Sequence, residues 1–97
     1  MALVNVLGWR GKKIIDPKGN IVGEVEAVDL DLEKWLVTGL QVGLTKESAL
    51  EAGFKRPSLG RIIVVIPMEL ISAIGDAITV REESRVLKDL VKYLGWR

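Results

Sequence analysis

The fold of this chain is decided by the stretch GKKIIDPKGNIVGEVEAV, residues 11–28. Two short runs of mainly β-branched or apolar residues flank residues 16–20, DPKGN, in which Pro restricts φ and Gly or Asn tolerates a positive φ. This pattern predicts a β-hairpin. Beyond Val25 the apolar positions change parity, to Val28 and Leu30, so we expect a β-bulge there that returns the side chains to the inner face.

A second stretch, IPMELISAIGDAITV at residues 66–80, predicts another hairpin, folded about Gly75 and Asp76. Between the two stretches we expect a turn over 29–34, a strand over 35–44 and a short helix over 46–52 that Thr45 caps. Residues 62–66, IIVVI, are apolar on both faces. Such a strand is either central in a small barrel or covered by another element.

The tail of the chain has a different periodicity. Five apolar residues fall at i, i+1, i+4, i+5 and i+8, which predicts an amphipathic helix over about 84–94; they are Val86, Leu87, Leu90, Val91 and Leu94. An apolar stripe of this size is too costly to leave in water, so we expect the chain's own barrel or a second copy to cover it.

The tetrapeptide LGWR occurs twice, at residues 7–10 and 94–97. It is either a coincidence or a sign that Trp9 and Trp96 dock on one surface.

The amino-acid composition limits the classes of function that we expect for this chain. The chain has 97 residues, with 14 basic and 13 acidic side chains and no His or Cys. We therefore expect one domain, no cofactor or metal, and no enzymatic activity, because the usual general base, thiolate nucleophile and transition-metal ligands are missing. We find no signal peptide and no apolar run long enough to span a bilayer, so we expect a cytoplasmic protein.

Two groups of charged residues are candidate sites. Asp29, Asp31 and Glu33 alternate and suit either a metal cluster or a solvated turn; we favour the turn, because no base or nucleophile is nearby. Basic residues beside tryptophans suggest nucleic-acid contacts. The net charge of +1 argues against that interpretation. The basic residues concerned are Arg10, Lys12, Lys13, Lys55, Arg56 and Arg61.

The two hairpins resemble those of the PRC-barrel family, named for the photosynthetic reaction-centre H subunit. The first hairpin carries Gly11-Lys12, Asp16, Gly19 and Gly23-Glu24-Val25; the second carries Ile66-Pro67, Ile71, Ile74, Gly75-Asp76 and Ile78. The resemblance implies a mainly β fold, a small six-stranded barrel over about 7–81, which this chain extends by a short helix in the 45–60 insertion and a C-terminal amphipathic helix.

The resemblance also implies a docking or assembly role. Small stand-alone archaeal PRC-barrel proteins include adaptors of the cell-division machinery, and a ribosome-maturation factor carries a related domain that binds a ribosomal protein. With the apolar stripe of the tail, which a second copy would cover, we expect a homodimeric, non-enzymatic adaptor, with an RNA- or ribosome-associated barrel as the alternative. The expected contact residues are the apolar stripe and the three tryptophans: Trp9, Trp35, Val86, Leu87, Leu90, Val91, Leu94 and Trp96.

Overall fold

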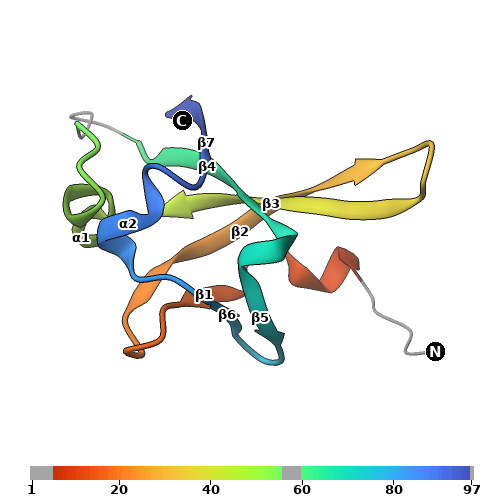
Figure 1. Ribbon diagram of the computed structural model, residues 1–97, viewed down its shortest axis with the longest axis horizontal. Coiled ribbons are helices and arrows are strands. Elements are labelled where there is room, and N and C mark those ends of the chain that lie inside the picture. The colour runs from red at the N-terminus through yellow and green to blue at the C-terminus, as the bar shows by residue number, and fades with distance from the viewer. Residues whose placement is uncertain (1–5, 56–59, 97) are drawn as a thin grey trace.

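The chain forms one curved, seven-stranded sheet over the described residues, 6–55 and 60–96, of a computed structural model (Figure 1). The strands are β1 (Lys13–Ile15), β2 (Ile21–Asp31), β3 (Leu36–Leu44), β4 (Ile62–Pro67), β5 (Ile71–Ile74), β6 (Ile78–Val80) and β7 (Lys92–Trp96). Four short helices accompany them: η1 (Val6–Trp9), α1 (Lys46–Glu51), η2 (Met68–Leu70) and α2 (Ser84–Leu87).

The strand order is β5-β6-β1-β2-β3-β4-β7, and all neighbours are antiparallel except β1 and β6. The mainly β class expected from the sequence is confirmed. The expectation of six strands in a closed barrel is not: the sheet contains seven strands, and β5 and β7 remain its two edges. The seventh strand comes from the tail, where the periodicity predicts a helix.

The first hairpin forms as its sequence predicts. Asp16 is buried in the turn, where its Oδ1 accepts hydrogen bonds from the backbone N–H groups of Lys18 (3.0 Å) and Asn20 (2.9 Å). Gly19 adopts φ +85°. The expected bulge is also present, because the β2–β3 register shifts between Val25 and Ala27.

The helix of the insertion is confirmed as well. α1 begins after Thr45, whose side chain accepts a hydrogen bond from the backbone N–H of Ser48 (3.1 Å). It ends before Gly53, which has φ +87° and follows the last helical turn as a C′ glycine does.

The C-terminal helix predicted over 84–94 is wrong beyond Leu87. α2 has four residues, a turn follows in which the N–H groups of Leu90 and Val91 both donate to the carbonyl of Leu87, and the chain then forms β7 against β4. The physical reason is the need of β4 for a partner. A buried strand cannot leave one edge of N–H and C=O groups unpaired, and this tertiary pairing outweighs the helical periodicity of the tail.

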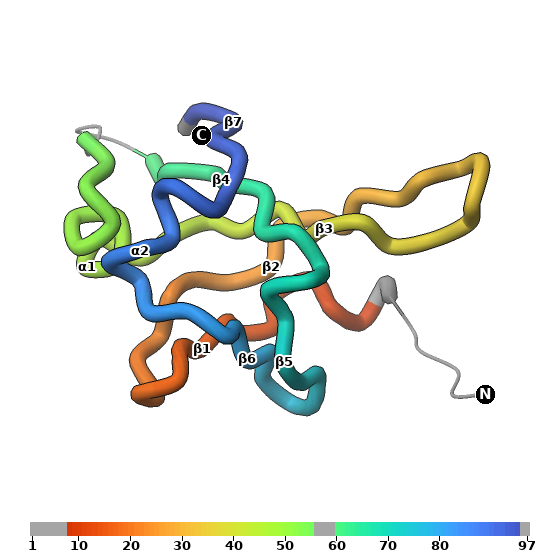
Figure 2. Tube along the Cα trace, viewed as in Figure 1, coloured from red at the N-terminus to blue at the C-terminus, as the bar shows by residue number. Residues whose placement is uncertain are grey.

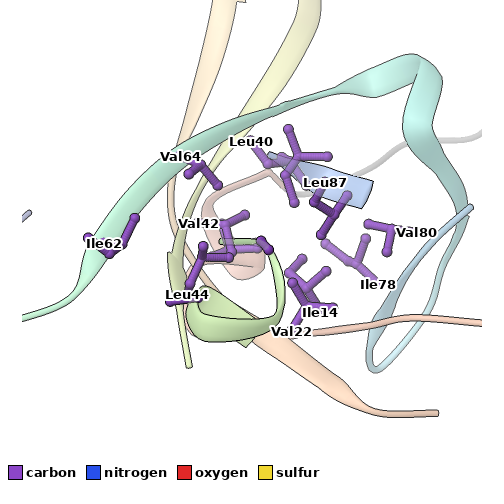
Figure 3. Close-up of a cluster of buried hydrophobic side chains, with 14 of the residues drawn as sticks. Ile14, Val22, Leu40, Val42, Leu44, Ile62, Val64, Ile78, Val80 and Leu87 are labelled. Carbon is purple, nitrogen blue, oxygen red and sulfur yellow. The ribbon is translucent and has the colours of Figure 1, made fainter. Parts of the chain in front are cut away.

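Residues 62–66 form a strand inside the sheet, paired along one edge with β3 and along the other with β7, and all of these residues except the half-buried Val65 are buried. The inner face of the curved sheet is filled by aliphatic side chains from every part of the chain, which Figure 3 shows converging. They include Ile14, Val22, Leu40, Val42, Val64, Ile78, Val80 and Leu87.

Over the described part of the chain, none of the helices combines the length and the apolar character that a bilayer crossing requires.

Candidate interaction surface

The structure divides the expected contact residues into buried and exposed ones. Trp9 is 5 % exposed and Leu87 is 1 % exposed, and both belong to the hydrophobic core. They stabilise the fold and are left out of the candidate surface. The side chain of Trp96 lies outside the described residues, so a surface shared by the two LGWR tetrapeptides stays a prediction.

Trp35 lies at the tip of a long hairpin that β2 and β3 form. β4 pairs with β3 only over Gly39–Gly43. The part of the hairpin between Gly39 and the turn therefore pairs with no third strand among the described residues. Figures 1 and 2 show this part projecting from one end of the molecule. The hairpin tip, which we define as residues 29–36, therefore reaches into solvent on several sides.

Large apolar side chains are gathered on this tip. Trp35 is 77 % exposed, Leu32 66 %, Leu36 57 % and Leu30 49 %. About half of the surface of Leu30 and more than half of that of the other three are open to solvent, although burying one such side chain is worth about 1.5–3 kcal/mol. Leu30 pairs with Val37 and Asp31 with Leu36, so Leu30 and Leu36 lie on opposite faces of the hairpin. Large apolar side chains exposed on both faces of a projecting turn are a feature of surfaces that bind another molecule.

The acidic residues of the tip shape the turn. Asp31 Oδ1 accepts hydrogen bonds from the N–H groups of Glu33 (2.9 Å) and Lys34 (3.2 Å), and Asp29 Oδ1 accepts one from Gln41 Nε2 (2.8 Å). These contacts are those of an Asx turn and of a cross-strand pair. No group of three or more His, Cys, Asp or Glu residues suited to a metal ion occurs within residues 6–55 and 60–96.

Trp35 also has an unusual backbone. Its φ is +54°, and it is the one residue other than Gly with a positive φ in the described part of the chain. This left-handed region is normally occupied by Gly, Asn or Asp, and a bulky residue there is an outlier. The conformation turns the tip and presents the indole ring to solvent.

A second exposed apolar group lies in α2, the following turn and β7, which we name the α2–β7 segment, residues 84–96. Val86, Leu90, Tyr93 and Leu94 are between 38 % and 52 % exposed. Tyr93 stacks on Phe54 with ring centroids 5.7 Å apart, and Lys88 Nζ lies 5.6 Å from the centre of the same Phe54 ring. Lys88 Nζ also donates to the carbonyl of Gly53 (3.1 Å).

The basic residues that suggested nucleic-acid contacts are mostly engaged within the protein. Lys13 Nζ lies 2.7 Å from Glu24, and Arg61 lies 3.5 Å from Glu24 and 3.1 Å from Glu26. Lys12 Nζ donates to the carbonyl of Gly75 (2.6 Å).

Arg10 and Lys55 are exposed, and Arg56 lies outside the described residues. The fold thus joins Lys13 and Arg61, from two separate basic clusters of the sequence, around a pair of carboxylates.

The same ion pairs adjust the acidity of Glu24. The hydrogen bond from Lys13, then the charge of Lys13, and to a smaller extent Arg61 hold the pKa of Glu24 below its usual value. A shallow depression of about 280 Å³ beside this network is lined in part by Lys13, Glu24 and Arg61. Its charged lining consists of Lys13, Lys46, Arg61 and Glu24, of which Lys13 and Arg61 pair with Glu24, and the depression contains no nucleophile paired with a base among the described residues.

Sequence reasoning missed Leu30, Leu32, Leu36 and Tyr93 as surface residues. The first two were visible in the sequence: they alternate with three acidic residues inside a predicted turn, and turns rarely carry large aliphatic side chains. Tyr93 was not identified as a surface residue because the sequence predicts a helix for the tail, and the apolar stripe of that helix does not include Tyr93.

Comparison with known proteins agrees with the hairpin motifs. No curated protein matches the chain. A family model described as the PRC-barrel domain matches residues 9–87, from η1 to the end of α2. This match covers most of the chain, and the chain therefore belongs to the PRC-barrel domain family.

Proposed function

We propose that this chain is a non-enzymatic docking module, an adaptor that binds a protein partner through the hairpin tip. Membership of the PRC-barrel domain family suggests a small interaction or assembly module, and the tip supplies a surface for that role. The chain contains no His or Cys. The side chains best suited to acid–base or phosphate chemistry, Glu24, Lys13 and Arg61, are held in ion pairs.

The observation that carries the proposal is Trp35. Its indole is 77 % exposed, and its backbone is in a conformation that costs a bulky residue of the order of 1 kcal/mol. Gly or Asn would form the same turn with less strain, so neither the turn nor the core accounts for a tryptophan at this position. A tryptophan that costs stability in the free chain and offers a large rigid apolar surface is suited to an interface.

The tip is also preorganised. Asp31 holds the turn through two backbone N–H groups, and Leu30 lies directly opposite Val37 in the register of the hairpin. Because the loop is already ordered, binding loses less conformational entropy than a flexible loop would lose.

The proposal is tested by capture from the native organism with three immobilised proteins: the intact chain, Trp35→Gly, and Leu50→Ser as the matched control. Leu50 is 61 % exposed on α1, away from the tip, so its replacement removes a similar apolar side chain from another surface. We expect a partner that the intact chain and Leu50→Ser retain and Trp35→Gly loses at least tenfold.

At a concentration where the chain is monomeric, the thermal midpoint of Trp35→Gly should not fall below that of the intact chain, because Gly adopts the positive φ without strain and the variant loses no buried contact within the chain. Identical captured proteins for all three baits would contradict docking through the tip.

The cellular setting is proposed from the family resemblance. This resemblance suggests archaeal cell division; we further propose, from the sequence, that the adaptor is a cytoplasmic homodimer. Imaging a fluorescent fusion in dividing cells tests this setting: a band at the division site supports it, and a uniform signal through the cell cycle contradicts it. RNA binding is not part of the proposal, because Lys13 and Arg61 are neutralised by Glu24 and Glu26.

A further inference from the structure

The two exposed apolar groups of this chain differ in the sign of their charges. The hairpin tip, residues 29–36, carries three acidic side chains and one basic, namely Asp29, Asp31, Glu33 and Lys34. The α2–β7 segment, residues 84–96, carries Arg85, Lys88, Lys92 and Asp89; Arg85 pairs with Glu83 (3.0 Å), so Lys88 and Lys92 are the basic side chains that this segment offers to a partner. Each surface thus combines exposed aliphatic and aromatic side chains with the charge that the other attracts.

The two surfaces cannot meet within one chain. The molecule measures 41 × 27 × 22 Å, and Figures 1 and 2 show the hairpin tip at one end of the long axis and α2 toward the other. They can meet between two copies that lie side by side and antiparallel, since this arrangement brings the tip of each copy to the α2–β7 segment of the other.

We infer that the partner of the hairpin tip is a second copy of this chain, in a closed two-fold dimer in which each tip packs on the α2–β7 segment of the other copy. This inference rests on the proposed docking role of the tip and names its partner. The two-fold axis makes the contact reciprocal, so every tip and every segment in the dimer is occupied and assembly stops at two.

The size of the contact favours the closed dimer over an open chain of copies. A stable interface buries about 800 Å² on each partner. A tip of eight residues, 29–36, provides only part of that area. The closed dimer makes the contact twice, whereas each link of an open chain makes it once.

Pairing of the two β7 edges is another way in which copies of this sheet could associate, and the structure opposes it. The β4–β7 register shifts between Ile63 and Val64, and Gly95 has φ +117°. A bulge of this kind twists an edge strand and interrupts the regular row of N–H and C=O groups that another strand would need. Side-chain contacts with the α2–β7 segment do not require that row.

The test uses charge reversal on the full chain. Glu33→Lys changes the tip and Lys92→Glu changes the segment; both side chains are exposed, so neither change should alter the thermal midpoint by more than a few degrees. In sedimentation equilibrium we expect the intact chain to be a dimer at tens of micromolar. Each single variant should dimerise about tenfold more weakly, because its homodimer places like charges in both contacts.

Mixing the two single variants in equal amounts is the decisive measurement. In their heterodimer the introduced lysine of one copy faces the introduced glutamate of the other, and the second contact keeps the original Glu33 and Lys92, so dimerisation should recover. The double variant Glu33→Lys/Lys92→Glu should recover it too. Trp35→Gly should weaken the dimer at least tenfold.

A chain that stays monomeric at about 100 µM overturns the inference, as does a dimer that is indifferent to both charge reversals or a mixture that fails to recover. Species that grow beyond the dimer with concentration overturn the closed arrangement. None of these results affects the capture experiment, in which a different protein lost only by Trp35→Gly would still support docking through the tip.

Discussion

Gly23 on β2 lies against the backbone of β3. A Cβ at Gly23 would lie 2.2 Å from the carbonyl oxygen of Gly43, too close for any side chain. The glycine that belongs to the family's hairpin motif is therefore required by the approach of two strands, and has no part in a binding site.

We predict that Gly23→Ala lowers the free energy of unfolding by about 1–3 kcal/mol, because backbone atoms must move to admit the methyl group. Urea denaturation measures the change. Gly75→Ala is the control: its Cβ would meet nothing closer than 3.8 Å, so this variant should stay within about 1 kcal/mol of the parent. Equal losses in the two variants would contradict the explanation.

Glu24 gives the chain a pH dependence. Its pKa is lowered in the folded state, mainly by the hydrogen bond and charge of Lys13. A carboxylate with a lowered folded pKa stabilises the fold above its unfolded pKa, and this contribution is lost as the pH falls below the unfolded value and through the folded one. The pair is exposed to solvent, so its contribution at neutral pH is less than about 1 kcal/mol.

We predict that Glu24→Gln lowers the thermal midpoint slightly at pH 7 and reduces its fall between about pH 5 and pH 3. Thermal unfolding followed by circular dichroism across this range provides the measurement. Glu51→Gln, a change at an exposed glutamate of α1, serves as the control. If Glu24→Gln and Glu51→Gln gave the same slope, the Lys13–Glu24 pair would not be the source of the effect.

At the scale of elements, the tail and the first hairpin differ in whether nearby or distant residues determine their structure. The hairpin of β1 and β2 was predictable because its turn is determined by adjacent residues: Asp16 accepts the N–H groups of the turn, and Gly19 supplies the positive φ. The strand in the tail was not predictable. The helical spacing of the tail is local, whereas the edge of β4 with which it pairs lies far earlier in the chain.

We predict that a chain ending at Val91, which lacks β7, loses about 2–4 kcal/mol of stability, because four paired positions on β4 lose their partners. It should also aggregate, since Ile62 to Val65 become an apolar edge strand. Thermal unfolding and size-exclusion chromatography measure both effects, and a chain that lacks only Arg97 is the control. A monomeric truncated chain with an unchanged midpoint would contradict the role of β7.

At the scale of the whole molecule, the proposed binding of a partner depends on the elongated shape of the sheet, and not on closure into a barrel. Because β2 and β3 continue beyond the other strands, an apolar tip lies far from the core that holds the sheet together (Figure 1). The tip can therefore bind a partner without disturbing the core, and the core tolerates changes at the tip.

The closed dimer predicts a shape that small-angle X-ray scattering can measure. Two antiparallel chains side by side keep a long dimension close to the 41 Å of one chain and enlarge one of the shorter dimensions, 27 or 22 Å. An end-to-end pair would instead approach twice the length of one chain. A maximum dimension near that doubled value would contradict the side-by-side arrangement.

The sequence alone determined the mainly β class, the two hairpins, the bulge after Val25 and the helix that Thr45 begins, because each depends on residues close together in the chain. Only the tertiary structure decided that residues 92–96 form a strand, that Trp9 and Leu87 are buried, and that Lys13 and Arg61 meet at Glu24. These features depend on which distant segments share an edge or a face. The local periodicity of the sequence does not indicate which distant segments pair. In the tail, the need of β4 for hydrogen-bond partners outweighs the helical periodicity.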